Sequence, residues 1–195
     1  MITAWRFDSP GSWRSLAALP PLRVSMDWYG APLDAPMEFR LGIDRDRLWF
    51  GAAIARQPEC DLKLRPGDFV EGLWEHDVAE LFLGESTGAP YREFNVSPRG
   101  AWWSCSFGAP RIRASAEPLS SVETWSDVST ERWQAGLAVP LRELGLAWSE
   151  THPLRVNMTA CLGQPQRYVT ATRLSAPAPD FHLPQQFPLL RLAAA

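Results

Sequence analysis

Apolar and polar side chains alternate over many short stretches of this chain, which is the pattern of β-strands. The clearest stretch runs from residue 73 to residue 103. It contains three apolar runs, 78–83, 91–96 and 101–107, and a proline and glycine turn at 97–100 joins the last two. Because such short connections join neighbouring antiparallel strands, we expect a three-stranded meander here.

Apolar runs of strand length recur through the rest of the chain, at residues 22–28, 37–43, 48–55, 132–139, 154–162, 168–172 and 187–192. The polar tetrad 44–47 separates two of them and is typical of a hairpin tip. Residues 140–145 begin with proline and end with glycine, which predicts one short helix. Residues 175–180 hold two prolines, so we expect them to cross an end of the fold outside the sheets.

The predicted fold class is therefore all-β. We expect an antiparallel β-sandwich of two packed sheets, of the jelly-roll or immunoglobulin-like kind, with one short helix. The chain has 195 residues, of which 46% are hydrophobic, and this suits a single domain over residues 1–195 with a substantial core. It also has ten tryptophans, most of which we expect in that core.

The composition of the chain limits the kinds of binding partner that we expect. A net charge of -3 gives no electrostatic attraction to a nucleic-acid backbone. No segment approaches the roughly 20 apolar residues of a membrane span, and the first residues lack the features of a secretory signal. We expect a cytoplasmic protein if Met1 is the native start, and leave the location open otherwise. The oligomeric state is not predicted.

The sequence gives no sign of catalytic or metal chemistry. It has no nucleophile elbow, phosphate loop or dinucleotide fingerprint. Its three cysteines lie far apart, and His76 and Glu80 have a spacing that joins side chains on a helix but not on a strand. We therefore expect a protein that is not an enzyme and needs no metal or cofactor. The enzymatic alternative is a glycosidase that uses Asp77, Glu80 or Glu93.

A few polar and aromatic positions stand out against the apolar pattern. Glu80 lies inside an apolar run, where an ionised carboxylate needs either a ligand or a partner such as Arg92, Arg99 or Arg155. Trp74 precedes that run and suits either ring stacking on a ligand or the core. His182 suits either a hydrogen bond to its own loop or a ligand contact.

Several motifs in a fixed order point to a known family. They are residues 74–83 with 94–102, then 133–141 with 144–145, 155–157, and 181–184 with 187. In this order they resemble the family 9 carbohydrate-binding modules and their wider DOMON-like relatives. The resemblance covers most of the chain after residue 20 and implies a sandwich with a shallow site that grips the end of a sugar chain between tryptophan rings.

The resemblance also implies ligand-binding residues. Trp74 matches one stacking ring, Glu80 a hydroxyl acceptor and Asn157 an amide ligand, and to these we add Arg99 and His182. The second stacking tryptophan of those modules is missing, because residues 168–182 contain none, so Tyr168 or His182 would have to replace it. Their calcium sites find no match here. The predicted function is non-catalytic, lectin-like binding of a carbohydrate or related polyol by aromatic stacking and hydrogen bonds to hydroxyls.

Two alternatives remain open at this stage. DOMON-like relatives include haem binders, and axial ligands could come from Met26, Met37, Met158, His76, His152 or His182. The other alternative is an interaction domain that keeps the sandwich and has lost the sugar site.

Overall fold

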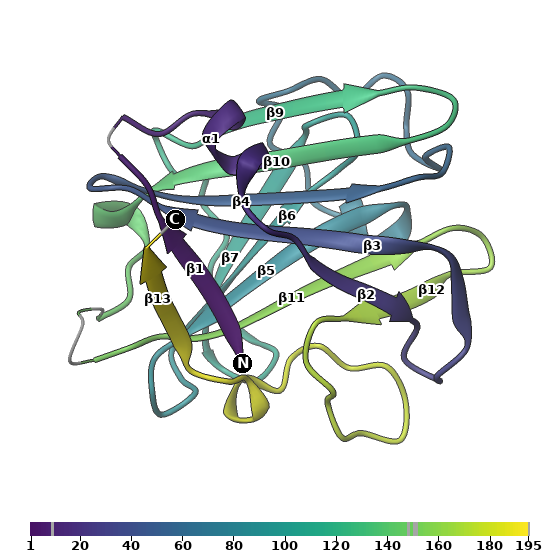
Figure 1. The fold of residues 1–195 in the computed structure, drawn as a ribbon. Helices are drawn as coiled ribbons and strands as arrows, with labels where there is room; N and C mark the ends of the chain where they lie inside the picture. Colours follow the sequence, from purple (N-terminus) through teal and green to yellow (C-terminus); the bar gives the residue numbers. More distant parts are fainter. Residues whose placement is uncertain (9, 148, 150–151, 195) are drawn as a thin grey trace.

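The computed structural model describes residues 1–8, 10–147, 149 and 152–194. Over these residues the chain forms two β-sheets that lie face to face, one with seven strands and one with six (Figure 1). The predicted β-sandwich is confirmed. In the described part of the chain, no helix is long and apolar enough to span a membrane.

The seven-stranded sheet contains strands from both ends and from the middle of the chain. Its strands are β1 (Ile2–Arg6), β2 (Leu22–Met26), β3 (Pro32–Ile43), β4 (Arg47–Ile54), β9 (Glu123–Val128), β10 (Trp133–Pro140) and β13 (Leu190–Ala194). Their order is β13-β1-β3-β4-β10-β9, and β2 also pairs with β3. β1 runs parallel to both β13 and β3. We expected antiparallel pairing throughout the sandwich, and these two parallel pairings of β1 depart from that expectation.

The six-stranded sheet contains the predicted meander. Its strands are β5 (Val78–Gly84), β6 (Tyr91–Val96), β7 (Trp102–Ala109), β8 (Ile112–Ser115), β11 (Arg155–Leu162) and β12 (Arg167–Thr170). The order is β12-β11-β5-β6-β7-β8, with antiparallel pairing throughout. The turn between β6 and β7 closes as expected, since Ser97 accepts from the backbone N–H of Gly100 at 2.9 Å. Gly100 has φ of +80°, and a Cβ there would lie 3.1 Å from Pro66, so both features favour glycine.

The main core lies between the sheets and follows from the alternation of side chains along each strand. Leu81, Phe94 and Met158 of the six-stranded sheet face Phe39 and Phe50 of the other, and each is at most 1% exposed. Full burial of a side chain of this size contributes about 2–3 kcal/mol to folding. The opposite residues of β5, β6 and β7 are also buried, because segments outside the sheet cover them.

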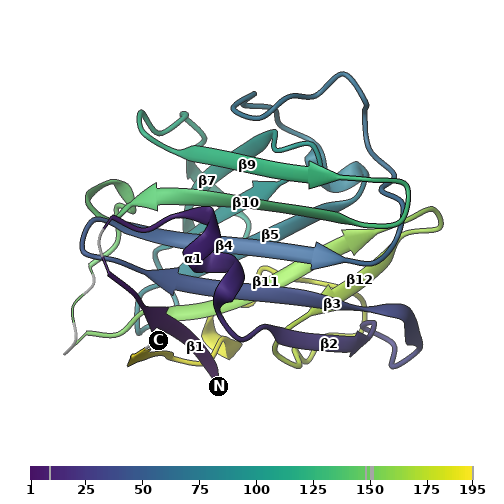
Figure 2. The ribbon, with the colours of Figure 1, turned by 45° about the horizontal axis from the view of Figure 1, so that its top comes forward.

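The prediction of a helix at residues 140–145 is wrong. Pro140 is the last residue of β10, and only a 3₁₀ turn, η2 (Leu141–Glu143), follows it. Two further 3₁₀ turns are η1 (Leu73–Glu75) and η3 (Pro184–Gln186). The α-helix of the described structure, α1 (Trp13–Ala18), lies instead across the outer face of the seven-stranded sheet (Figure 2).

α1 has only six residues, too few for a stable isolated helix, so packing and capping must hold it. Its one buried residue, Leu16, packs onto Gly51 of β4. At its start, the hydroxyl of Ser12 accepts from the backbone N–H of Ser15 at 3.1 Å, a cap that contributes about 1 kcal/mol.

Candidate functional site

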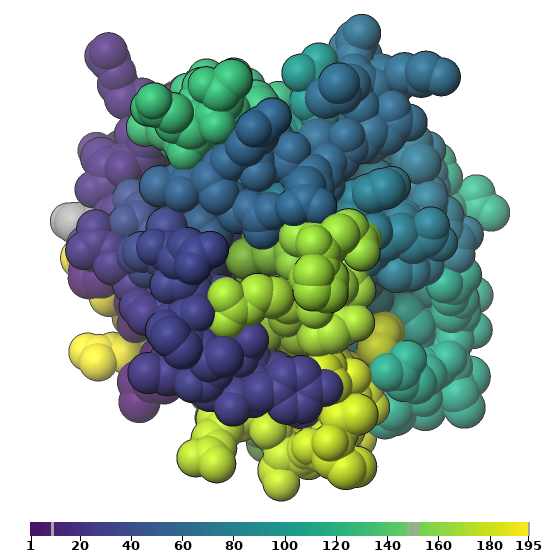
Figure 3. Space-filling model, turned by 90° about the vertical axis from the view of Figure 1, so that its right-hand side faces the viewer, coloured from purple at the N-terminus to yellow at the C-terminus, as the bar shows by residue number. Residues whose placement is uncertain are grey.

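The outer face of the six-stranded sheet holds a pocket of about 310 Å³. It is surrounded by η1, by the turn between β7 and β8 together with β8, and by the segment from β12 to η3. Figure 3 shows the surface hollowed where the lime, yellow and teal parts of the chain meet. Its floor consists of strand residues, chiefly Glu80, Phe82, Glu93 and Cys161.

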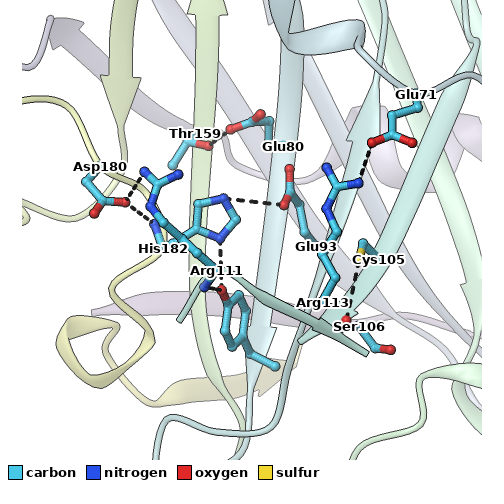
Figure 4. Close-up of polar contacts among 11 residues, drawn as sticks. Glu71, Glu80, Glu93, Cys105, Ser106, Arg111, Arg113, Thr159, Asp180 and His182 are labelled. Atoms are coloured by element: carbon cyan, nitrogen blue, oxygen red, sulfur yellow. Dashed lines mark hydrogen bonds and ion pairs between the residues drawn. The ribbon is translucent and has the colours of Figure 1, made fainter. Parts of the chain in front are cut away.

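Strand register brings two carboxyl groups together on this floor. Glu80 of β5 is paired with Asn95 of β6, and Glu93 of β6 is paired with Phe82 of β5. The two acids are therefore diagonal neighbours on one face, for which the separation is typically about 7–8 Å between Cα atoms. Both are at most 4% exposed. Figure 4 shows the two side chains on adjacent strands.

Burial makes ionisation of these acids costly. It raises the pKa of Glu80 to about 7, although a 2.6 Å hydrogen bond from the Thr159 hydroxyl acts in the opposite direction. Burial, and after it the nearby charge of Glu80, raise the pKa of Glu93 to about 8. The acids titrate as a pair, so near neutral pH the floor holds at least one proton. Such a floor can both donate and accept hydrogen bonds.

A hydrogen-bond chain fixes the imidazole of His182 beside Glu93. Burial lowers the pKa of His182 to about 4, so the ring is neutral near pH 7. The Tyr91 hydroxyl oxygen accepts from the backbone N–H of Arg111 at 3.0 Å, and it lies 2.8 Å from Nδ1 of His182. If Tyr91 donates its hydroxyl proton to Nδ1, then Nε2 carries the hydrogen. Nε2 lies 3.8 Å from Glu93 (Figure 4), which places a donor and an acceptor side by side in the pocket.

Aromatic rings stand at two sides of the floor. Trp74 of η1 packs edge-to-face on Trp103 of β7, with ring centroids 5.2 Å apart. On the other side, Tyr168 of β12 packs edge-to-face on Phe181, with centroids 6.2 Å apart. β7 and β12 are four strand spacings apart, about 19 Å. Thr159 of β11, Glu80 of β5 and Glu93 of β6 lie on the strands between them. The pocket thus has two aromatic walls and a polar floor.

Two arginines line the rim, and both are engaged with acids. Arg111 forms a 2.8 Å ion pair with Asp180, which ties the β7–β8 turn to the segment that carries His182. Arg113 pairs with Glu71, and its guanidinium lies over the Trp103 ring, 5.2 Å from the centroid. These contacts brace the walls of the pocket, and in the described part of the chain neither floor acid forms an ion pair with a guanidinium.

The structure brings together three of the five residues predicted to bind ligand. Trp74, Glu80 and His182 all line the pocket. Asn157 lies outside the lining, since its fully buried amide bonds Thr170 at 3.0 Å and Thr172 at 3.2 Å. Arg99 also lies outside it, in the 97–100 turn.

The alternative role of Glu80, as a partner of an arginine, does not match the structure. Its hydrogen bond comes from Thr159, while Arg92 bonds Ser104 and Arg155 bonds backbone carbonyls. Tyr168, considered as a replacement for the missing tryptophan, does line the pocket.

Sequence reasoning missed much of the remaining lining. Phe181 belongs to the motif at 181–184 but is not among the residues expected to bind ligand, and nothing local in the sequence marks Arg111 or Arg113. Glu93 was singled out only as a candidate glycosidase acid. Its alternation with Phe94 placed it on the face opposite the core, which is the signal that could have found it.

The described residues offer little to a metal or a haem. No group of three or more His, Cys, Asp and Glu side chains in the described ranges could hold a metal ion. Within the described lining, His182 has no second histidine and no methionine beside it. Met37 and Met158 lie in the core between the sheets, and Met26 is exposed.

Comparison with solved structures agrees with this architecture. A protein from Bacteroides uniformis, provisionally assigned as carbohydrate-binding, matches with a TM-score of 0.77 and 16% identity over 98% of each chain. A family 9 carbohydrate-binding module from Caldicellulosiruptor kristjanssonii in complex with glucose matches with a TM-score of 0.65 and 11% identity, over 100% of this chain and 96% of that one. The structure of such a module from the same organism with cellotriose gives 0.65 and 10%, over 100% and 94%.

By contrast, no family model and no curated protein sequence matches this chain. At such low identities, the structural likeness establishes the fold alone. The chain has the β-sandwich fold of the family 9 carbohydrate-binding modules, as its sequence motifs predict.

Proposed function

We propose that the pocket on the six-stranded sheet binds a carbohydrate or related polyol without catalysis. The observation that carries the proposal is the meeting of Trp74 and Glu80 in one open pocket, on a fold shared with modules solved in complex with glucose and cellotriose. Both residues were expected at a sugar site before the pocket was known.

The chemistry of the pocket suits a sugar ring. The apolar C–H faces of a pyranose pack on aromatic rings, and here Trp74 and Tyr168 stand on opposite sides of the floor. Sugar hydroxyls both donate and accept hydrogen bonds. The half-protonated pair Glu80 and Glu93 can do both as well, and the Nε2–H of His182 can donate. The pocket is small, so we propose that it holds one terminal unit of a chain.

Calorimetric titration with mono- and oligosaccharides tests this proposal. We expect this pocket to bind with millimolar to micromolar Kd, and we expect Trp74→Ala to abolish binding at this pocket without unfolding the protein. Glu80→Gln keeps an acceptor for Thr159 but removes the titratable proton, so we expect it to weaken binding about tenfold at neutral pH. Trp5→Phe is the control, because Trp5 lies in β1 on the other sheet.

Two results would count against the proposal. If a broad panel of sugars gave no heat at millimolar concentration, the fold would be that of an interaction domain without a sugar site. If binding survived Trp74→Ala unchanged, the ligand would lie elsewhere.

The acid pair also supports a second candidate function, glycoside hydrolysis. Retaining glycosidases use two carboxyl groups about 5–5.5 Å apart, one protonated and one ionised, and the diagonal pair Glu80 and Glu93 meets the protonation requirement. Prolonged incubation with oligosaccharides and aryl glycosides separates the candidates. If the wild-type protein released product and the Glu93→Gln variant did not, catalysis would be established. If the wild-type protein bound the sugar and left it intact, the binding role would be supported.

A further inference from the structure

A second groove lies on the outer face of the seven-stranded sheet, on the opposite side of the sandwich from the pocket. It runs beside α1 over β3, β4, β10 and β9, and its volume, about 310 Å³, equals that of the first pocket. Figure 2 shows how α1 lies across these strands. We propose that this groove is a second and independent binding site, and that it takes a neutral saccharide ring.

Strand register hollows this face of the sheet. Trp125 of β9, Gly136 of β10, Gly51 of β4 and Arg40 of β3 form one row across four strands. The two glycines leave space between the large outer residues, and α1 uses part of it. A Cβ on Gly136 would lie 3.0 Å from the ring of Trp13. The helix therefore sits on the glycine row.

The helix gives the groove an aromatic wall. Trp13 stacks on Trp125, with ring centroids 6.0 Å apart and an angle of 19° between the planes. Both indoles are only partly buried, and both line the groove. Residues on the solvated face of a sandwich are usually polar, so a stacked indole pair here is unusual for a surface with no ligand.

The open part of the groove lies over the next row of the sheet. There Gln134, Ala53 and Glu38 follow one another on β10, β4 and β3, and Asp127 of β9 lies beside Gln134 outside the lining. Ala53 forms the floor and is only partly buried, so α1 does not close this row. Gln134 and Glu38 are two strand spacings apart, about 10 Å, which leaves room for one ring over Ala53.

The charges around the groove are already paired. Glu38 accepts hydrogen bonds from Arg23 at 2.8 Å and from Arg40 at 3.0 Å. Asp127 accepts from Gln134 at 3.1 Å and from Arg132 at 3.3 Å. An ionic ligand would therefore gain little, because each acid has a guanidinium partner. A neutral ligand with several hydroxyls can use the lone pairs and N–H groups that these pairs leave free.

These features together specify the ligand class. An indole wall and an alanine floor suit the C–H face of a sugar ring, and fixed polar groups on both sides suit its equatorial hydroxyls. The volume lies at the lower end of the range for small-molecule sites, roughly 300–1,000 Å³. The groove shares no lining residue with the first pocket, so each site can be tested independently of the other.

The test is an NMR titration of the Trp74→Ala protein, in which the first pocket is disabled, with methyl glycosides of glucose, galactose, mannose and xylose. We expect the indole N–H signals of Trp13 and Trp125 to shift with at least one of them, at millimolar concentration. Trp125→Ala should remove the shift of the Trp13 signal. Because this variant could also disturb α1, the second variant is Ala53→Gln, which fills the floor and leaves both indoles in place.

The control for Ala53→Gln is Ala18→Gln, on an exposed position of α1 outside the groove. We expect at least a tenfold loss of affinity in the first and none in the second. The inference is overturned if no glycoside shifts the Trp13 and Trp125 signals, or if Ala53→Gln leaves the affinity unchanged. In the wild-type protein, shifts confined to Trp74 and Trp103 would leave only the first site, and shifts confined to Trp13 and Trp125 would leave only the second.

Discussion

Replacing Glu93 by glutamine tests whether the pocket floor holds its proton as the structure indicates. Burial raises the pKa values of Glu80 and Glu93 in the folded state, to about 7 and about 8. Between an unfolded-state pKa of about 4.3 and these values, the folded protein binds more protons than the unfolded chain. The stability that this provides is fully present below about pH 4.3 and is lost as the pH rises through the folded-state pKa values.

The magnitude follows from the number of excess protons. Each one lowers the free energy of unfolding by about 1.4 kcal/mol for every unit of rising pH. With two buried acids, the wild-type slope approaches about 2.8 kcal/mol per unit in the middle of this range. Glutamine has nearly the same shape and cannot ionise, so Glu93→Gln should remove about half of the slope. As the pH rises from about 5 to about 7, the free energy of unfolding of the variant should increase by roughly 2.7 kcal/mol relative to that of the wild type.

Urea unfolding at a series of pH values measures this difference directly. Glu131→Gln, which changes an exposed carboxylate on the hairpin between β9 and β10, is the matched control and should leave the slope unchanged. An unaltered slope in Glu93→Gln would refute the reasoning, because it would mean that Glu93 ionises as freely in the folded protein as in the unfolded chain.

Four further predictions follow from particular contacts. Asp77→Ala should lower the free energy of unfolding by about 2–4 kcal/mol in urea melts, because this buried carboxylate accepts two backbone N–H bonds, at 2.6 and 3.1 Å. Gly136→Ala should cost about 1–3 kcal/mol in the same assay, since the new Cβ would lie 2.7 Å from the carbonyl oxygen of Phe50. Arg92→Met should raise the free energy of unfolding by about 1 kcal/mol, because no carboxylate in the described ranges lies within salt-bridge distance of this buried guanidinium. Sugar affinity measured by calorimetry should change between about pH 6 and pH 9 in the wild type and stay flat when both floor acids are glutamine.

Strands whose side chains alternate and whose partners are near in sequence could be predicted. The β5–β6–β7 meander was expected from its apolar runs and its turn at 97–100, and it is confirmed within two residues at each end. The hairpin tip at 44–47 is confirmed as well, because the Asp44 carboxylate accepts from the backbone N–H groups of Asp46 and Arg47, both at 2.8 Å. Local signals were sufficient for these elements.

Elements that depend on distant partners could not be predicted. β1 is held by parallel pairing to β13, from the other end of the chain, and no local pattern announces such a contact. β8 has only four residues and all of them are exposed, so no buried side chain marks it as part of a sheet. α1 exists because glycines on β4 and β10 make room for it, and this depends on the sheet rather than on the helix sequence.

The residues of the candidate site also fall into those that a local sequence signal marks and those that only distant contacts place. Glu80 could be found because an acid within an apolar run is a local anomaly, and the structure places it on the pocket floor. Phe181 and Arg111 lie on loops whose position depends on the Arg111–Asp180 ion pair and on packing against β5, and no local signal in the sequence places either of them in the pocket. Asn157 has the expected strand position, but Thr170 and Thr172 of the neighbouring chain segment occupy its amide.

The distribution of tryptophan connects the two grooves. We expected most of the ten tryptophans in the core. Of the nine that the structure describes, four are buried, Trp49, Trp102, Trp103 and Trp133, and among these Trp133 packs in the core between the sheets. Trp103 and the partly buried Trp74 line the pocket on one outer face, and the partly buried Trp13 and Trp125 line the groove on the other. Outer faces of antiparallel sheets ordinarily carry polar side chains, and burying indoles there requires additional chain segments to cover them. Here the cover is incomplete at two places, and at both places partly open indoles lie beside fixed polar groups, which is the arrangement that a sugar ring requires.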